Sequence, residues 1–446
     1  MSAGLRAGYK QTEVGVIPED WEVAPLSNLS EFITSGSRGW ATHYADRGAL
    51  FVRSQNVRAG RLDFADRQFV NAPVGAESNR TRLKQSDLLI TITGNSVGNV
   101  ALVEEELGEA YISQHVGLVR LSDPFQGSYI CRFLAPGSAG NEQIFASQSG
   151  QSKPGLSLTN LQEFLVALPP VSEQRAIATA LSDMDALLAK LDQFIAKKHD
   201  LKQATMQQLL TGQTRLPGFS GEWEVNRLGE LFGFSGGHTA SRDQLSDSGY
   251  CYLHYGDIHL SKKTYIDVDA EFQAIPKLVV GLSDVSTVSL LKDGDVVFVD
   301  ASEDDEGTSK HIVVVNHDDR PYISGLHTIV AKSKGNRMDN LFKRYCFQTR
   351  NIKEQFRFFA VGTKVSGISK TSVAKVELHF PPSLKEQTAI ATILSDMDAE
   401  LAALEARRDK TRALKQGMMQ ELLIGRIRLV ETNALIAIVD TEPSMS

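Results

Sequence analysis

The sequence predicts an α+β protein in which two similar globular domains are separated by two long helices. These helices are expected to pair as an antiparallel coiled coil with pseudo-two-fold symmetry. Three observations support this fold: an internal repeat, a heptad stripe in each copy of it, and strand-like runs alternating with glycine-containing loops in both halves. A chain of 446 residues is also too long for one compact core, so several domains are expected.

The repeat is clearest in two helical segments. Glu173–Leu216 aligns with Glu386–Leu429 at a constant offset of 213, and 26 of the 44 positions are identical. An apolar stretch ending in Pro-Pro precedes each copy, at Pro169 and Pro381. Duplication therefore organises the chain. We expect domains at 1–168 and 217–380, helical segments at 169–216 and 381–429, and a C-terminal tail at 430–446.

The two ends of the chain also belong to the repeat. Trp21-Glu22-Val23 near the N-terminus resembles Trp223-Glu224-Val225, which follows the first helical segment, and no such motif follows the second. If the N-terminus lay beside the end of the second helix, it would supply the missing motif. The sequence thus predicts a closed, pseudo-symmetric arrangement of the two copies.

Each helical segment carries an apolar stripe with heptad spacing, which is typical of helices that pair. Proline cannot lie inside a helix, so each helix is expected to begin after Pro-Pro, and Gly212 and Gly425 stand where the helices should end. The alternative is that each helix packs only on its own domain. The stripe residues expected in helix pairing are Ile177, Leu181, Met184, Leu188, Leu191, Ile390, Leu394, Met397, Leu401 and Leu404.

Strand-like runs and loops in both globular regions favour mixed domains of about 150 residues each. One helix is expected at Met338–Phe356. The predicted strands are Leu88–Thr93, Val116–Leu121, Val296–Asp300, His311–Val315 and Thr328–Ala331.

Composition excludes several classes of protein. Three separated cysteines exclude a disulfide framework and a cysteine-rich zinc site, and no apolar run is long enough to span a membrane. The first residues lack the apolar stretch of a signal peptide, so a cytoplasmic protein is expected. His254 and His259 have no third ligand at a suitable spacing, and the acidic run 303–306 is read as a solvated loop, so no metal site is expected.

Motifs of catalysis are missing as well. The sequence contains no GxxxxGK[ST] phosphate loop and no N/D-P-P-Y/F motif of amino-methyltransferases. The glycines of Phe232–Gly237 do not have the spacing of a nucleotide-binding turn. The chain is therefore expected to have no catalytic residues and no cofactor of its own.

The duplicated arrangement of WEV, a glycine loop such as SGSRGW, LPPVSEQRAIATALSDMD and LKQ…QQLLTG resembles the specificity subunit of type I restriction–modification enzymes. The resemblance covers almost the whole chain before residue 430. It implies two target recognition domains that each read one half of a split double-stranded DNA site. It also implies conserved helices that set the spacer and bind two methyltransferase subunits.

The same resemblance implies a non-catalytic subunit. S-adenosylmethionine, ATP and magnesium would act on the partner methyltransferase and restriction–translocase subunits. The alternatives are a recognition subunit of a methyltransferase-only system, a fused restriction–methylation protein and a helical scaffold without a DNA function. The missing motifs disfavour the fused protein, and salt-sensitive duplex binding would exclude the scaffold.

The net charge of −7 conceals local basic stretches. Nine basic and four acidic residues lie between Arg38 and Lys84, and ten basic and two acidic residues between Lys332 and Lys370. Such stretches suit phosphate contacts, although solvated surface is the simpler interpretation. Arg38, between glycines that would let the backbone approach the groove, is the candidate base reader, and its counterpart loop has His238 and Thr239 instead. The other candidate DNA-binding residues are Arg53, Arg58, Arg61, Arg80, Arg82, Lys84, Lys153, Lys343, Arg344, Arg350, Lys353, Arg357 and Lys364.

Polar residues retained in both helical copies suggest docking of the same partner twice. The SDMD motif supplies two carboxylates in each helix, and simple helix solubility is the competing explanation. The candidate methyltransferase-docking residues are Asp183, Asp185, Gln207, Asp396, Asp398 and Gln420.

Overall fold

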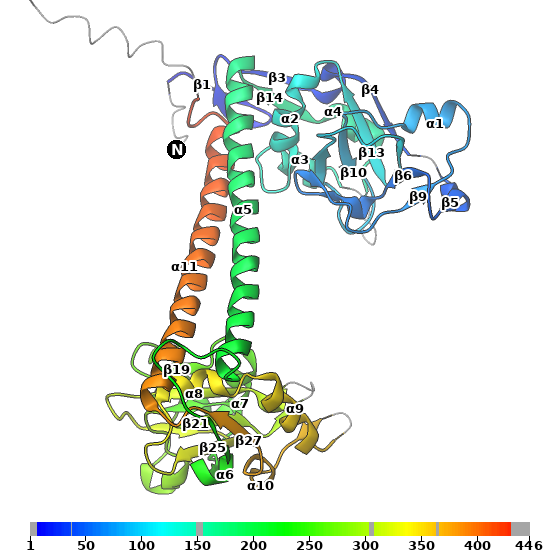
Figure 1. Ribbon diagram of the computed structural model, residues 1–446. Coiled ribbons are helices and arrows are strands. Elements are labelled where there is room, and N and C mark those ends of the chain that lie inside the picture. Colours follow the sequence, from blue (N-terminus) through cyan, green and yellow to red (C-terminus); the bar gives the residue numbers. More distant parts are fainter. Residues whose placement is uncertain (1–6, 37, 149–154, 303–306, 363–364, 430–446) are drawn as a thin grey trace, which may run out of the picture. The chain divides into compact units, whose positions relative to one another are not determined.

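A computed structural model describes residues 7–36, 38–148, 155–302, 307–362 and 365–429. Contacts divide the chain into two units, Met1–Asp192 with Ala406–Ser446, and Gln193–Glu405. Each unit contains one globular domain and part of each of two long helices, α5 (Val171–Leu210) and α11 (Leu384–Leu422) (Figure 1). Within the described part of the chain, no helix is long and apolar enough to cross a membrane.

The first domain contains two four-stranded sheets, ordered β11-β10-β13-β4 and β12-β6-β9-β5. A hairpin β1–β2 and the antiparallel pair β14–β3 complete it, with the short ribbon β7–β8. The strands are β1 Tyr9–Thr12, β2 Gly15–Pro18, β3 Glu22–Pro25, β4 Ser30–Ser35, β5 Tyr44–Ala45, β6 Ala49–Val52, β7 Val57–Arg58, β8 Arg61–Leu62, β9 Phe69–Val70, β10 Leu88–Thr91, β11 Val100–Leu102, β12 Ala110–Ile112, β13 Val116–Leu121 and β14 Leu165–Leu168. The helices are α1 Ala76–Thr81, α2 Gly127–Leu134, α3 Asn141–Ala146 and α4 Leu158–Glu163.

The second domain follows the same plan with added strands. Its sheets are ordered β16-β25-β21-β23-β19 and β17-β20-β18-β24, with pairs β15–β27 and β22–β26. The strands are β15 Glu224–Arg227, β16 Phe232–Gly236, β17 Leu245–Ser246, β18 Tyr250–Leu253, β19 Tyr265–Asp267, β20 Lys277–Leu278, β21 Val296–Val299, β22 Ala301–Ser302, β23 His311–Val315, β24 Tyr322–Ser324, β25 Thr328–Ser333, β26 Ser366–Gly367 and β27 Glu377–Phe380. The helices are α6 Leu228–Leu231, α7 Tyr255–Leu260, α8 Asn340–Cys346, α9 Arg350–Phe359 and α10 Lys370–Val373.

A central strand in each domain is buried on both faces, which explains its continuous apolar run. In β10, Leu88 and Ile90 belong to the cluster that contains α2, whereas Leu89 belongs to the cluster that contains the second sheet. In β21, Val296 faces the cluster with α8 and α9, and Val297 faces the cluster with β18. Because successive side chains of a strand point to opposite faces, each domain has a helix layer and a sheet layer around this strand.

The helix predicted at Met338–Phe356 is wrong, because the structure contains two helices there. Asp339 caps α8 by accepting a hydrogen bond from the Phe342 backbone NH (2.9 Å), and Thr349 caps α9 by accepting one from the Ile352 NH (3.4 Å). Such side-chain caps mark helix starts, so the capping threonine begins a new helix within the apparently continuous pattern.

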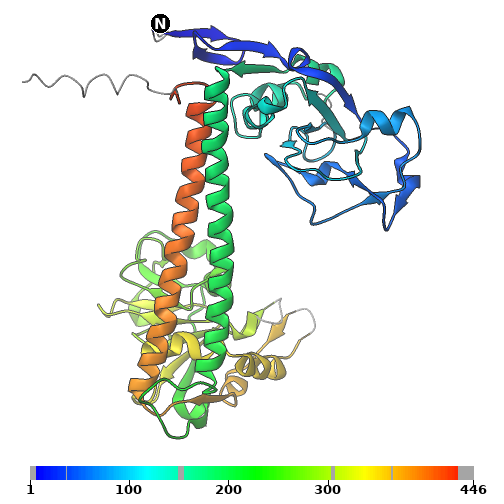
Figure 2. The same cartoon turned by 45° about the horizontal axis from the view of Figure 1, so that its top comes forward.

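The helices α5 and α11 run antiparallel in both units. In the first unit, Asp185 pairs with Lys415 (2.5 Å) and Asp192 with Arg408 (3.9 Å), so the partner's number falls as the α5 number rises. The second unit continues the order with Lys198–Glu400 (2.7 Å) and Lys202–Asp398. Figures 1 and 2 show the two helices side by side in each unit.

The apolar stripe contributes both to helix pairing and to the domain cores. Ile177 and Leu181 join the core of the first domain, and Ile390 and Leu394 join that of the second. Leu191 and Leu401 are also buried, whereas Met184, Leu188, Met397 and Leu404 are half-buried. The two explanations of the stripe are thus combined, since each helix packs on its own domain as well as on the other helix.

Each helix begins with a buried glutamate that holds the end of the other helical segment. Glu173 is 1% exposed and accepts hydrogen bonds from Arg428 (2.8 Å) and from the Trp21 indole (3.3 Å). Glu386 is 2% exposed and accepts from Arg215 at 2.6 and 2.7 Å. Charge-assisted bonds of this kind compensate for burying a carboxylate.

The segment around Trp21 lies beside the end of the second helical segment, as the shared WEV motif predicts. Arg428 lies over the Trp21 ring at 5.8 Å, and Arg215 lies over the Trp223 ring at the same distance. Gly425 and Gly212 have φ angles of +69° and +72°, and a Cβ at either would approach Trp21 or Trp223, at 3.0 and 3.3 Å respectively. The N-terminal tryptophan therefore takes the place that Trp223 takes in the other unit.

Arg428→Ala should lower the stability of the first unit by roughly 3 kcal/mol, because it leaves the buried Glu173 carboxylate without its cation. Arg215→Ala should do the same to the second unit through Glu386. The measurement is denaturant unfolding followed by fluorescence.

Arg426→Ala is the matched control, since Arg426 forms an exposed pair with Glu421 (3.3 Å). It should cost less than about 1 kcal/mol. An Arg428 variant as stable as this control would show that the buried pair does not hold the helix ends.

Candidate nucleic-acid interface

The loop that carries Arg38 follows β4, and its glycines have a structural reason. A Cβ on Gly36 would lie 2.2 Å from the carbonyl carbon of Ser113, and a Cβ on Gly237 would lie 1.8 Å from the Gly325 oxygen. Our interpretation that the glycine lets the backbone approach DNA is therefore corrected at Gly36. There glycine is needed because two segments of the protein touch.

The loops of the two domains carry different side chains on an equivalent backbone framework. Arg38 is exposed and stands between this tight contact and Gly39, whose φ is +89°. In the second domain, Thr239 is exposed and His238 half-buried, and the His238 NH donates to the Ser324 oxygen (2.7 Å). The common backbone contact thus positions loops of different chemistry.

Several predicted cations of the first domain are exposed, and two of the predicted cations have partners within the protein. Arg58, Arg61, Arg82 and Lys84 are exposed. Arg80 donates to the Ser35 carbonyl oxygen (2.7 Å) and to Thr34, so it braces the end of β4 below the Arg38 loop. Arg53 pairs with Asp66 (3.0 Å) and has a side chain only 22% exposed. Arg80 is exposed as well, so its contact with phosphate stays a prediction beside this positioning role.

In the second domain, one predicted DNA contact is wrong. Lys343 is 2% exposed, and its ammonium donates to the Gly294 carbonyl (2.9 Å), Ser333 Oγ (2.9 Å) and Asn340 Oδ1 (2.8 Å). Burial lowers its pKa, since desolvation disfavours the charged form. Arg344 is half-buried and lies over the Tyr265 ring at 4.0 Å.

Three predicted cations share one exposed face of α9. Arg350, Lys353 and Arg357 follow each other at helical spacing, and all three are exposed. Arg350 also pairs with Glu354 one turn away (2.7 Å). Lys153 and Lys364 lie outside the described residues, as does the tail after residue 429.

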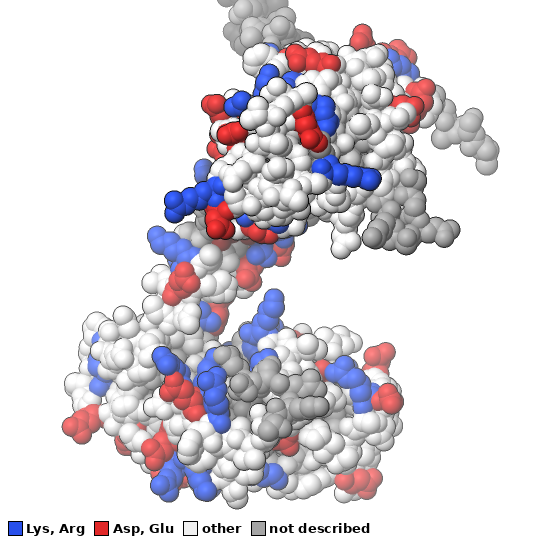
Figure 3. All heavy atoms as spheres, turned by 90° about the vertical axis from the view of Figure 1, so that its right-hand side faces the viewer, with Lys and Arg blue, Asp and Glu red and all other residues white. Residues whose placement is uncertain are grey.

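The face drawn in Figure 3 carries lysines and arginines among carboxylates in each unit. This mixture of signs agrees with the net charge of −7.

The SDMD carboxylates divide into two kinds. Asp185 accepts hydrogen bonds from Arg132 (2.9 Å) and Lys415, and Asp398 accepts from Tyr345 (2.8 Å) and Lys202. Burial alone would raise the pKa of Asp185, but these hydrogen bonds outweigh it and lower the pKa. We therefore correct the docking prediction for Asp185 and Asp398, which join the helices to each other and to their domains.

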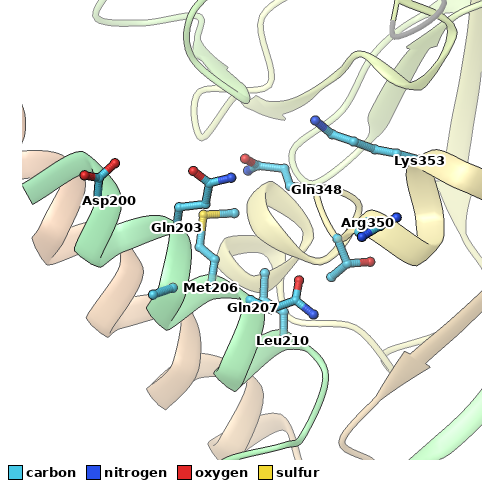
Figure 4. Close-up of a pocket in the computed structure, with 10 residues that line it drawn as sticks. Asp200, Gln203, Met206, Gln207, Leu210, Gln348, Arg350 and Lys353 are labelled. Carbon is cyan, nitrogen blue, oxygen red and sulfur yellow. The ribbon is translucent and has the colours of Figure 1, made fainter. Parts of the chain in front are cut away.

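Asp183 and Asp396, in contrast, are exposed on the helix surface. Gln207 and Gln420 line corresponding grooves between a helix end and the globular domain of the same unit. The groove at Gln207 has a volume of 580 Å³ and the one at Gln420 a volume of 500 Å³. Figure 4 shows Gln203, Met206 and Gln207 projecting from α5 toward the segment that joins α8 to α9.

The described residues contain no cluster of histidine, cysteine, aspartate or glutamate that could hold a metal ion. His254 Nδ1 accepts a hydrogen bond from the Gly256 NH (3.0 Å) and caps α7. His259 lies 3.2 Å from the Ala301 carbonyl oxygen. Both histidines thus have local structural partners, and residues 303–306 lie outside the described residues.

Sequence analysis missed the roles of several acidic residues. Besides Glu173 and Glu386, Asp87 pairs with Arg120 (2.7 Å) and Asp295 with Lys332 (2.8 Å). Each of these aspartates also accepts a backbone NH, from Lys84 or Lys292. These aspartates occupy matching positions in the two copies of the repeat, which could have indicated a shared role. A match alone does not identify the cation that pairs with each aspartate.

Two repeated mixed domains with divergent loops, joined by paired helices, define a modular binding protein. The family model for the type I restriction modification DNA specificity domain matches the chain twice, at residues 18–198 and 220–412. The chain therefore belongs to this family, and it is a specificity subunit that recognises DNA sequence with two repeated domains.

Relatives and solved structures agree with this assignment. The chain is 24% identical to the provisionally named MjaX specificity subunit of a type I restriction enzyme of Methanocaldococcus jannaschii, over 94% of this chain and 97% of the relative. It is 21% identical to the MjaVIII specificity subunit of the same organism, over 94% and 95%. The crystal structure of a type I restriction–modification S subunit from M. genitalium covers 90% of this chain and 96% of its own, with 15% identity and a TM-score of 0.53. This last similarity supports the fold.

A buried histidine predicts that the second domain loses stability in acid. His311 packs against Phe347 (5.1 Å) and Phe298 (5.7 Å), and burial lowers its pKa to about 4. Because the unfolded chain binds a proton near pH 6.5, stability is full above that pH and is lost as the pH falls toward 4. We expect the wild type to lose on the order of 3 kcal/mol over this range through His311.

His311→Phe should remove this part of the pH dependence, as measured by denaturant unfolding at pH 7 and pH 4.5. His317→Gln is the control, because His317 is 75% exposed. An unchanged acid sensitivity in His311→Phe would contradict the assignment.

Proposed function

We propose that each globular domain reads one half of a bipartite target in double-stranded DNA. The observation that carries this proposal is the contrast between shared framework and divergent loops. Gly36 and Gly237 make the same kind of backbone contact, while Arg38 in one loop corresponds to His238 and Thr239 in the other. Arginine bonds guanine through two acceptors, which the other two side chains do not reproduce, so the two domains would prefer different bases.

The exposed cations would position the duplex without specifying its sequence. Arg58, Arg61, Arg82 and Lys84 serve the first domain, and Arg350, Lys353 and Arg357 the second. The paired helices join the two reading domains and set the spacer between the half-sites. The chain contributes recognition only, and partner subunits supply methylation and cleavage with S-adenosylmethionine, ATP and magnesium.

Exchanging residues 1–168 for the first domain of another family member tests this division. The exchange should change one half-site and leave both the other half-site and the spacer length unaltered, because the second domain and both helices are retained. Methylome sequencing of a host that carries the hybrid with its partner subunits measures all three. A change in both half-sites would refute independent reading.

We further propose that two methyltransferase subunits bind the helical surfaces that occur twice. Asp183 and Asp396 occupy matching exposed positions, and Gln207 and Gln420 line matching grooves. A single type of partner would meet the same side chains at both places. The internal engagement of Asp185 and Asp398 leaves the other two carboxylates as the charged part of this surface.

Replacing Asp183 and Asp396 by lysine should weaken co-purification of the methyltransferase at least tenfold, the effect of losing about 1.4 kcal/mol of binding free energy. Glu105→Lys with Asp247→Lys is the charge-matched control, since both residues are exposed in the globular domains. Equal co-purification by the two variants would show that Asp183 and Asp396 serve only helix solubility.

A further inference from the structure

A second turn lies against the loop of Gly237 in the second domain. It joins β24 to β25 and consists of Gly325, Leu326 and His327. His238 forms a parallel bridge with Gly325, and a Cβ on Gly325 would lie 2.5 Å from the Leu253 carbonyl oxygen. The turn is therefore packed closely against the protein, as the loop of Gly237 is, and the two backbones lie side by side.

The Tyr252 hydroxyl ties the turn to the loop. It donates to the His238 carbonyl (2.9 Å) and accepts a hydrogen bond from the Leu326 NH (3.2 Å). The ring of Tyr252 is buried, and burial raises its pKa, so the hydroxyl keeps the proton that it donates. Because one hydroxyl bonds both backbones, the position of Leu326 is fixed relative to His238.

The backbone of the turn is held in an uncommon conformation. His327 has a φ angle of +61°, and its Nδ1 lies 3.3 Å from Asp300 Oδ1 while its ring lies edge-on to Tyr255 at 5.4 Å. Thr328 Oγ1 donates to the Gly325 carbonyl (2.6 Å) and closes the turn. Such a conformation persists only where surrounding contacts hold it, and conformations of this kind concentrate at functional sites.

The side chains of the turn are exposed, at 41% for Leu326 and 50% for His327. A single exposed leucine needs no explanation by itself. The place of Leu326 beside the proposed reading loop gives it a candidate role. The C5-methyl group of thymine is the apolar feature among the base edges of the major groove, so an apolar side chain that reaches a base edge selects thymine.

The first domain has the equivalent turn with different side chains. It joins β12 to β13 after the same Tyr-Ile-Ser sequence, and its two residues, Gln114 and His115, are exposed. It also lies beside the reading loop, since a Cβ on Gly36 would meet Ser113 and the Gly36 NH donates to the Val116 carbonyl (3.3 Å). A glutamine amide matches N6 and N7 of adenine, whereas a leucine matches the thymine methyl group. The framework again recurs while the exposed side chains differ.

We propose that the turn of Leu326 and His327 is a second specificity-determining element of the second domain, and that Leu326 contacts the C5-methyl group of a thymine in its half-site. The proposal rests on the proposed DNA function and extends it from one loop to two. Tyr252 and His327 are positioning residues, because they hold the backbone that carries Leu326. Since leucine is neutral, counting basic residues along the sequence did not indicate this turn.

The test uses the full chain and duplexes that contain its target, as found by methylome sequencing. Each thymine of the second half-site is replaced in turn by deoxyuridine, which removes only the methyl group. Affinity, measured by fluorescence anisotropy, should fall about fourfold at one position, the effect of losing the burial of one methyl group. Leu326→Ala should bind the thymine and deoxyuridine duplexes equally. Leu414→Ala, the same change at an exposed leucine of α11, should keep the preference for thymine.

Equal binding of thymine and deoxyuridine duplexes by the wild type at every position would overturn the proposal without need of a variant. A preference for thymine that persists in Leu326→Ala would assign the methyl contact to another residue and would also overturn it. The same holds if Leu326→Ala keeps that preference but loses co-purification of the methyltransferase, since the turn would then contact a protein. If the wild type did not distinguish its target from a scrambled duplex, the proposed function itself would fall, which is a distinct result.

Discussion

The burial of one glutamate at the start of each long helix is the constraint on which the rest of the structure depends. A carboxylate that is 1 or 2% exposed needs a cation and further donors, and here the cation comes from the end of the other helical segment. The start of one helix is thereby fixed to the end of the other, which requires an antiparallel pair. Because the Trp21 indole donates a hydrogen bond to Glu173, the same constraint also fixes the segment around Trp21 within the first unit.

This constraint separates residues that are equivalent in the two units from residues that differ between them. Several features occur in both units because the helices and domains pack in the same way. They are the Asp185–Lys415 and Lys202–Asp398 pairs, the turns at Gly212 and Gly425, and the ion pairs of Asp87 and Asp295. The loops that begin at Gly36 and Gly237 share only their backbone contact, so their side chains are free to diverge. Recognition can then change without disturbing the frame.

The repeat, the heptad stripe and the glycine ends made the fold class and both long helices predictable from the sequence, and the strand-like runs did so for five strands. Other features of the structure depend on which residues, distant in the sequence, come into contact in the fold. The cap at Thr349 that splits one predicted helix is a single weak signal within a helical pattern. Likewise, no local pattern distinguishes Asp185, which bonds Arg132 and Lys415, from Asp183, which is exposed two residues away.

The same limit applies to the basic stretches, and it explains how an acidic protein can bind DNA. Of the cations between Lys332 and Lys370, Lys343 is buried, Lys332 pairs with Asp295, and Arg344 lies on Tyr265. Lys332 is neutralised by its carboxylate partner, while Lys343 and Arg344 are held against neutral groups of the domain itself. In the proposed interface, attraction to phosphate would come from the fewer exposed cations, each acting at short range under physiological salt. A protein built this way relies on accurate placement of a few contacts, and each domain is attached to its helix through shared core residues such as Ile177 and Ile390.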